Sequence, residues 1–324
     1  MLFSFRSLLL AACLAAALPA QARDFRSAEA HPADYPTTKA VEYMGQLLEE
    51  RSGGKLGVKV FPNGALGSER DTIEQLKIGG LDMMRINVAP LNNIVPETIV
   101  PALPFIFRSE DQMHEVLDGP IGEEILAAME EQGMVGLAFY DSGARSMYAT
   151  QPIKTLSDIQ HRKIRVQQSD LFVAMIEALG ANPTPMPYGE VYTALKTGLV
   201  DAAENNFPSY ESSRHFEAAP YYTQTEHSMA PEVVVFSKII WDRLDEENQK
   251  LIRQAAKDSV PHMRKLWDER EAKSRQIVEA GGAKIAPVED KQAWADAMKP
   301  VYEKFASTPE LKSLVERIQA SQGQ

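Results

Sequence analysis

The sequence predicts an α/β fold with mainly parallel sheets, divided into two lobes. Short runs with the alternating pattern of β-strands are separated along the chain by helical patterns, and this alternation is typical of α/β proteins. The chain has 324 residues, which is enough for a large core and favours a division into two lobes. An internal repeat, described below, relates the two lobes to each other.

The N-terminal segment is typical of a secretory signal peptide. It carries one positive charge, at Arg6, then an apolar run over residues 8–18 and a small-x-small cleavage motif that ends at Ala22. The apolar run is too short to span a membrane as a helix of the mature protein. We therefore predict a signal peptide over residues 1–22, cleavage after Ala22 and export to the periplasm.

An alternative interpretation of this segment is a lipoprotein signal, which would attach the mature chain to a membrane through Cys13. The apolar stretch before Cys13 is very short, however, and residues 14–18 are apolar where a polar tether is expected. We therefore favour soluble export. Cys13 is the only cysteine in the sequence, so cleavage after Ala22 leaves no thiol for nucleophilic chemistry or zinc ligation.

The composition is that of an ordinary globular protein with an acidic balance. Hydrophobic residues make up 44% of the chain and charged residues 24%, and the formal net charge is −11. This charge argues against nucleic acid or an anionic membrane surface as a partner. No later apolar stretch is long enough to cross a bilayer.

The elements after the signal segment are predicted from local patterns. Gly57–Phe61 has the pattern of a strand, Ser68–Leu76 that of a helix, and Leu81–Ile86 that of the next strand. Ser68 is a favourable N-cap, and Asp71 three positions later makes a weak form of the capping box. Further strands are predicted at residues 135–140, 163–166, 200–203 and 233–236.

The C-terminal part is predicted to be helical. Residues 246–280 carry an apolar stripe that includes Leu251, Val260 and Trp267. Pro261 should kink or split this helix, because proline lacks the backbone N–H that a helix interior uses. Two shorter helices are predicted at residues 294–305 and 311–318.

A faint internal repeat is the most informative feature of the organisation. Residues 76–82 match residues 195–201 at an offset of 119. Each copy is a helix, a glycine stop, and a strand that begins with Asp and ends in polar residues; the offset sets Arg85 against Glu204 and Asn87 against Asn206. Because ligands of open α/β sheets bind at the carboxyl ends of strands, we expect both lobes to direct these polar ends toward one cleft.

No catalytic or metal-binding motif is present. The nearest is His114–Asp118, which lacks the second histidine of a zinc motif, and there is no nucleophile elbow or phosphate-binding loop. We therefore expect a protein that is not an enzyme and that binds no metal or cofactor.

Three arginines lie at strand positions where core residues are expected: Arg85, Arg145 and Arg165. Any one of them could pair with a carboxylate to fix the fold. Three at the edge of one cleft indicate a ligand carboxylate, because buried cations need anionic partners and the arginine fork matches a carboxylate. Asn205 and Asn206, after Glu204, add amide groups at the same edge.

Several segments resemble the DctP-type periplasmic solute-binding subunits of TRAP transporters, and the resemblance covers essentially the whole mature chain. The segments that carry it are Phe61–Arg70, Ala102–Phe107, the Arg165 strand, Gly180–Met186, and Glu190–Leu195 with Asp201 and Glu204-Asn205.

This resemblance implies a fold like that of other periplasmic binding proteins. Two α/β lobes would be joined by a hinge of crossing strands, with a long C-terminal helix that crosses both lobes. We assign residues 23–145 mainly to the first lobe, 146–235 mainly to the second, and 236–324 to a return strand and C-terminal helices that pack on both. The implied partner is a membrane permease driven by an ion gradient, and we expect the binding subunit to be a monomer.

The resemblance also implies roles for individual residues. Arg165 is similar to the carboxylate-binding arginine of the family, Arg145 to a second, supporting arginine, and Asn205 to an amide on the same carboxylate. Cleft side chains are implied at His31, Glu69, Asn87, Gln168 and Tyr188. The stretches 31–36 and 84–87 further resemble members that bind hexuronates such as glucuronate and galacturonate.

The chemistry of these residues favours a polyhydroxylated monocarboxylate. Glu69 would repel a second carboxylate but can accept hydrogen bonds from hydroxyls, and Tyr188 or Tyr210 could stack on a sugar ring. Mixed donors and acceptors are expected from His31, Asn87, Asn206 and Gln168. Alternative ligands are a C4-dicarboxylate and an aldonic or sialic acid. Alternative functions of the protein are a receptor that presents its ligand to a sensor kinase and an enzyme that uses His31 and Glu69 as acid and base.

Overall fold

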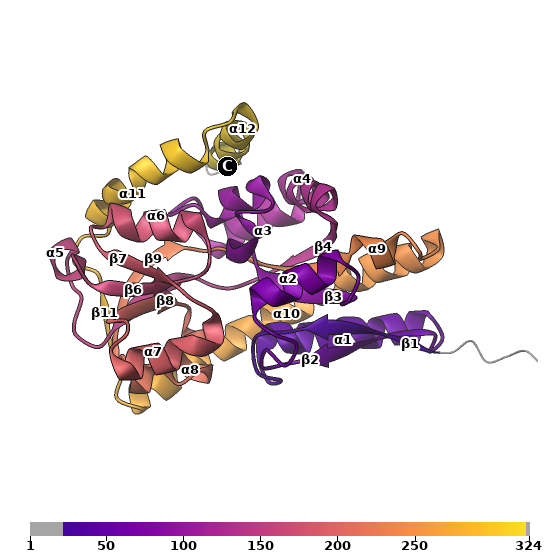
Figure 1. Ribbon diagram of the computed structural model, residues 1–324, viewed down its shortest axis with the longest axis horizontal. Coiled ribbons are helices and arrows are strands. Elements are labelled where there is room, and N and C mark those ends of the chain that lie inside the picture. The colour runs from indigo at the N-terminus through magenta and orange to yellow at the C-terminus, as the bar shows by residue number, and fades with distance from the viewer. Residues whose placement is uncertain (1–21, 322–324) are drawn as a thin grey trace, which may run out of the picture.

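The structure is a computed structural model that describes residues 22–321 (Figure 1). The predicted signal peptide lies outside this range except for Ala22. Two β-sheets, one in each lobe, form the framework, and helices cover their faces. The two-lobed α/β prediction is confirmed. No helix among the described residues is long and apolar enough to cross a membrane.

The first sheet has five strands in the order β2-β1-β3-β10-β4. Its strands are β1 (Arg23–Ala28), β2 (Leu56–Phe61), β3 (Met83–Asn87), β4 (Met134–Tyr140) and β10 (Glu232–Ser237). The helices that follow these strands or connect them are α1 (Pro36–Arg51), α2 (Glu69–Lys77), α3 (Glu110–Asp118), α4 (Pro120–Ala128), α9 (Lys238–Trp241) and the short 3₁₀ helices Ala89–Leu91, Pro96–Ala102 and Met129–Gln132.

The second sheet has six strands in the order β11-β9-β5-β8-β6-β7. Its strands are β5 (Arg145–Ala149), β6 (Lys163–Val166), β7 (Asn182–Pro185), β8 (Ala202–Asn205), β9 (Tyr221–Ser228) and β11 (Lys284–Pro287). The helices associated with it are α5 (Leu156–Ile159), α6 (Asp170–Ala178), α7 (Val191–Thr197), α8 (Phe207–Ser212) and the 3₁₀ helices Tyr188–Glu190 and His215–Glu217.

Both sheets are mainly parallel, as predicted, but each contains one strand that runs against the others. β10 is antiparallel to β3 and β4, and β5 is antiparallel to β8 and β9. The reason is that β5 and β10 are the strands that directly follow a crossing from the other lobe, from β4 to β5 and from β9 back to β10. Each crossing strand enters its new sheet against the direction of its neighbours. The lobe boundaries assigned above stay predictions.

The long helix α10 (Glu246–Ala280) spans both lobes (Figure 1). It packs on α1 and β4 of the first lobe and on α8 of the second. The helix runs without interruption through Pro261, so the prediction that this residue might split it is wrong. Val260 and Met263 on either side of Pro261 are buried in the first-lobe core and hold the helix there, while the proline itself faces solvent.

The remaining helices close the structure on the side opposite α10 (Figure 1). α11 (Lys291–Phe305) packs on α6 and β9, and α12 (Pro309–Ala320) packs on the 3₁₀ helix at residues 96–102. The apolar core beneath them is continuous between the lobes, because Ile86 of β3 and Ile164 of β6 belong to the same buried cluster.

Candidate functional site

A polar cavity lies between the two lobes, at the carboxyl ends of β3, β6 and β8. It encloses about 320 Å³ between its lining atoms, including space that opens to solvent, which is at the lower end of the range for small-molecule sites. The lining residues come from both lobes: Ala30, His31, Glu69, Arg85, Asn87, Arg145, Arg165, Gln167, Tyr188, Asn205, Ser209 and Glu232.

Arg165 contributes a buried cation to this cavity. Its neighbours Ile164 and Val166 are fixed in the core, and Arg165 itself is 2% exposed. The guanidinium Nε and Nη2 donate to the Met186 carbonyl oxygen at 3.2 and 2.9 Å. No carboxylate among residues 22–321 forms an ion pair with it. Burial and the nearby charge of Arg145 lower the pKa of Arg165. Its charge is therefore available to an anionic ligand.

Arg145, in contrast, is neutralised by the protein. Its Nε donates to Glu204 Oε2 at 2.5 Å, its Nη2 to Glu204 Oε1 at 2.9 Å, and its Nη1 to Asn205 Oδ1 at 3.0 Å. Burial alone would raise the pKa of Glu204, but the charge of Arg145 and a hydrogen bond from His227 lower it to about 2. The pair fixes the direction of Arg145 and Asn205 at the cavity wall.

Arg85 lies between two carboxylates of the first lobe. Its Nε donates to Glu29 Oε2 at 2.8 Å, and its Nη1 contacts Glu232 Oε2. Asn87, two residues along β3, donates to Glu232 Oε1 at 3.2 Å. One guanidinium thus faces two carboxylates, so this part of the wall is acidic although it contains an arginine.

Glu69 is the first residue of α2 and lines the cavity next to this cluster. The predicted capping box is confirmed: Ser68 Oγ accepts from the Asp71 N–H at 3.3 Å, and Asp71 Oδ2 accepts from the Ser68 N–H at 3.1 Å. This cap fixes the start of the helix and with it the position of Glu69. Burial and the charge of Glu232 raise the pKa of Glu69 to about 7.

His31 follows β1 and packs among aromatic rings at the edge of the cavity. Its ring stacks on Tyr35 with a centroid separation of 3.9 Å and meets the edge of Tyr188 at 5.0 Å. Burial lowers the pKa of His31 to about 4, so the ring is neutral at pH 7. Its Nδ1 atom is buried without a hydrogen-bond partner in the described part of the chain, which leaves it free for a ligand hydroxyl.

The structure brings eight of the eleven predicted site residues to this cavity and leaves three elsewhere. Gln168 lines a different surface cavity, beside Arg70 and Asn93. Asn206 caps α8 by accepting from the Ser209 N–H at 2.8 Å and donates to the Ser142 carbonyl oxygen at 2.7 Å. Tyr210 donates to the Ala219 carbonyl oxygen at 2.7 Å within the second-lobe core.

Sequence reasoning missed four lining residues: Ala30, Gln167, Ser209 and Glu232. Gln167 could have been found, because side chains alternate along a strand and residue 167 falls on the same face as Arg165. Its amide donates to Asn87 Oδ1 across the cavity at 3.2 Å. Glu232 reaches the cavity because β10 pairs with β3 in a register that places it opposite Asn87. This register could not be predicted from the sequence.

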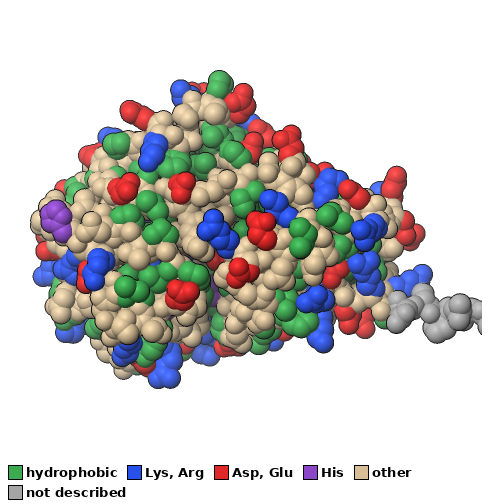
Figure 2. All heavy atoms as spheres, in the orientation of Figure 1, with side chains coloured by type: hydrophobic (Ala, Val, Ile, Leu, Met, Phe, Trp, Pro, Cys, Tyr) green, Lys and Arg blue, Asp and Glu red, His purple; other side chains and the backbone are tan. Residues whose placement is uncertain are grey.

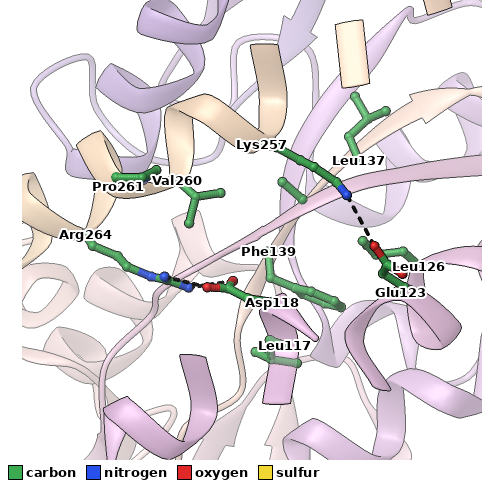
Figure 3. Close-up of a pocket in the computed structure, with 11 residues that line it drawn as sticks. Leu117, Asp118, Glu123, Leu126, Leu137, Phe139, Lys257, Val260, Pro261 and Arg264 are labelled. Atoms are coloured by element: carbon green, nitrogen blue, oxygen red, sulfur yellow. Dashed lines mark hydrogen bonds and ion pairs between the residues drawn. The ribbon is translucent and has the colours of Figure 1, made fainter. Parts of the chain in front are cut away.

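A larger cavity of about 630 Å³ lies between β4, α4 and α10 (Figure 3). Its walls are mainly apolar, and its charged residues pair with each other across the rim: Arg264 with Asp118 at 2.8 Å and Lys257 with Glu123 at 3.3 Å. Because these charges are satisfied, this cavity offers no anchor for an ion. On the molecular face in Figure 2, acidic and basic side chains are likewise interspersed.

Comparison with known proteins identifies the family of the chain. The model of the DctP family, bacterial extracellular solute-binding protein family 7, matches residues 27–308. A solute-binding protein of Chromohalobacter salexigens is 44% identical over 305 residues, 94% of this chain and 91% of that protein.

Solved structures of TRAP periplasmic solute-binding proteins share the fold. One from Bradyrhizobium sp. BTAi1, in complex with α/β-D-galacturonate, is 70% identical with a TM-score of 0.91 and covers 92% of this chain and 100% of that one. One from Pseudomonas putida F1, with bound D-glucuronate, is 40% identical with a TM-score of 0.90 and covers 93% and 98%. The chain therefore belongs to the DctP family of extracellular solute-binding proteins, the periplasmic binding subunits of TRAP transporters.

Proposed function

We propose that this protein binds a hexuronate, D-glucuronate or D-galacturonate, in the cavity between its lobes and delivers it to a TRAP membrane permease. The observation that carries the proposal is Arg165, a buried cation that faces the cavity without a carboxylate partner in the described chain. The ligands of the Bradyrhizobium and Pseudomonas proteins have the one carboxylate that this cation needs.

The proposed pose places the ligand carboxylate against Arg165, beside Asn205 and Arg145. Hydroxyl groups would then meet Glu69 and His31 on the opposite wall, with Asn87 and Gln167 between them. Tyr188, held by a hydrogen bond from its hydroxyl to the Ser209 carbonyl oxygen at 3.2 Å, packs beside the sugar ring. Gln168, Asn206 and Tyr210 are not part of this proposal, because they do not line the cavity.

We further propose that the protein acts as a monomer in the periplasm, after cleavage of the leader behind Ala22, and returns its ligand unchanged. Three cross-lobe bonds enclose the cavity: Tyr35 Oη to Ser209 Oγ at 2.8 Å, Gln167 to Asn87 at 3.2 Å, and Ser169 Oγ to Asn92 Oδ1 at 2.8 Å. This arrangement suits capture by closure of two lobes around a hinge.

Calorimetry with Arg165→Ala tests the proposal. Removing one partner of a buried charged pair costs about 3–5 kcal/mol, so affinity for galacturonate or glucuronate should fall by at least a hundredfold. Lys163→Ala is the matched control, because Lys163 is the exposed residue at the start of the same strand. Near-normal affinity in the Arg165 variant would contradict the assignment of Arg165 as the anchor of the ligand carboxylate. Recovery of the ligand in a chemically altered form would indicate an enzyme instead.

A further inference from the structure

The two walls of the cavity carry opposite charge, and each wall belongs to one lobe. The second-lobe wall holds Arg165, which has no ion-pair partner within residues 22–321, and Arg145, which is neutralised by Glu204. The first-lobe wall holds Glu69, Arg85 and Glu232, with Glu29 directly behind Arg85. We call these four first-lobe residues the acidic wall.

Three carboxylates and one guanidinium make up the acidic wall. Glu29 and Glu232 both bind Arg85, and all three side chains are nearly inaccessible to solvent, with Arg85 1% exposed. Burial would raise the pKa of Glu232, but Arg85 and His31 outweigh it and lower that pKa. The two carboxyl groups of Glu29 and Glu232 thus share the single guanidinium of Arg85, before Glu69 is counted.

The pKa of Glu69 indicates how the acidic wall affects a further carboxylate. It has no ion-pair partner among the described residues, and burial together with the charge of Glu232 raises its pKa to about 7. The opposing influence of Arg165, from the other wall, does not restore the ordinary value. A ligand carboxylate at the same place would meet the same desolvation and the same repulsion.

The acidic wall is nevertheless well suited to uncharged groups that donate hydrogen bonds. Ionised carboxylates only accept, and sugar hydroxyls can donate to them. Arg85 already directs its Nε and Nη1 donors to Glu29 and Glu232, so these donors are not available to a ligand anion. His31, neutral and with a buried Nδ1 that has no partner in residues 22–321, adds a further polar atom on this side.

From this geometry we propose that the acidic wall is the specificity determinant of the site: it accepts the hydroxyl-bearing end of a sugar acid and excludes a second carboxylate. The inference rests on the proposed function in taking Arg165 as the anchor of the first carboxylate. It fixes the orientation of the ligand, with the carboxylate on the second lobe and the hydroxyls on the first. It also assigns Glu232 and Glu29, which have no counterpart in the sequence-based prediction, a role in selecting monocarboxylates over dicarboxylates.

The test compares two open-chain ligands that differ only at one end. D-Galactonate ends in a hydroxymethyl group where galactarate has a second carboxylate. Calorimetry or competition against D-galacturonate gives the affinity ratio of the two for the full mature chain. We expect the wild type to prefer galactonate by at least about tenfold, since a repulsive interaction worth one pKa unit corresponds to that factor.

Glu232→Gln and Glu69→Gln should each reduce this ratio severalfold by improving galactarate binding. Glu74→Gln, an exposed carboxyl on the same helix as Glu69, is the matched control and should leave the ratio unchanged. If Glu232→Gln does not fold, Glu69→Gln still decides the test, because it breaks no ion pair in the part of the chain that the structure describes.

The outcomes separate this inference from the proposed function. A wild-type protein that binds galactarate as tightly as galactonate, or a ratio that both glutamine variants leave unchanged, overturns the role of the acidic wall even if hexuronates bind. Binding of another monocarboxylate in place of a hexuronate, with a ratio that both variants reduce, overturns the ligand assignment and supports the acidic wall.

Discussion

At the scale of single residues, the buried arginines of the site differ in whether a carboxylate of the protein neutralises them. Arg145 has a bidentate carboxylate and Arg85 has two carboxylates, whereas Arg165 donates, among the described residues, to the carbonyl oxygen of Met186. A buried guanidinium bound only to a neutral acceptor is costly. A ligand carboxylate relieves that cost, so the free energy of ligand binding is concentrated at Arg165.

The titration of Glu69 gives a prediction for the ligand-free protein. Its pKa is raised to about 7 from an ordinary value of 4.5, so between these values the folded state holds a proton that the unfolded state has released. The free energy of unfolding contributed by Glu69 therefore decreases as pH rises through this window. Glu69→Gln removes the ionisable group, and we expect it to raise the Tm relative to wild type more at pH 8 than at pH 5.

Thermal unfolding of the ligand-free protein at both pH values measures this difference. Glu74→Gln reports the general effect of removing a charge from α2. An equal effect of Glu69→Gln on Tm at pH 5 and pH 8 would contradict the raised pKa.

At the scale of elements, helix α2 connects a local sequence signal to the site. Ser68 and Asp71 exchange the two bonds of a capping box, and Glu69 is the next residue after the cap. Since both the start of the helix and the position of Glu69 depend on this cap, a change at Ser68 should affect stability and ligand selection together.

Ser68→Ala should lower the free energy of unfolding by about 1 kcal/mol, the usual cost of losing an N-cap side chain. It should also weaken binding of the sugar acid, because Glu69 is no longer held at a fixed helix start. Urea unfolding measures the first effect and calorimetry the second. Ser68→Thr, which keeps the hydroxyl that accepts from the Asp71 N–H and donates to the Asp71 carboxylate, should restore stability; failure to do so would show that the serine acts in some other way.

The elements also show what could be predicted from the sequence and what could not. The strand around Arg165 and the cap at Ser68 were predicted, because local alternation and cap chemistry act within a few residues of the chain. His31, Glu69, Asn87 and Tyr188 were predicted as cleft residues from the resemblance to the DctP-type family. Gln168 was predicted from the resemblance, whereas the alternation of β6 places Gln167 on the face of Arg165, where it lines the cavity. Glu232 was missed because its place depends on the pairing of β10 with β3, which are far apart in the sequence.

At the scale of the whole molecule, two strand crossings and α10 join lobes whose facing surfaces differ in charge. The first crossing, residues 141–144, contains Gly143 with φ of 57°, and a β-carbon there would lie 3.1 Å from the ring of Trp267 on α10. The crossing strand and the long helix therefore approach closely at a position that only glycine fits readily.

The bond between Tyr35 and Ser209 links the lobes directly beside the ligand cavity. Tyr35 precedes α1 in the first lobe, Ser209 lies on α8 in the second, and their hydroxyl oxygens are 2.8 Å apart. Tyr35→Phe keeps the ring that stacks on His31 and removes this link together with the longer bond of the same hydroxyl to Asn206 Oδ1 at 3.4 Å. A hydrogen bond of this kind contributes about 0.5–1.5 kcal/mol, so we expect a loss of affinity of up to about tenfold.

The loss should appear mainly in the dissociation rate of the ligand, because the bond exists only while the lobes are together. Surface plasmon resonance or stopped-flow measurements with the wild type, Tyr35→Phe, Ser209→Ala and the double variant form a double-mutant cycle. If the bond holds the lobes together, the double variant should lose no more affinity than either single variant. Fully additive losses would show that the two hydroxyls act independently, and the enclosure of the ligand would then depend on the contacts of the ligand itself with both walls.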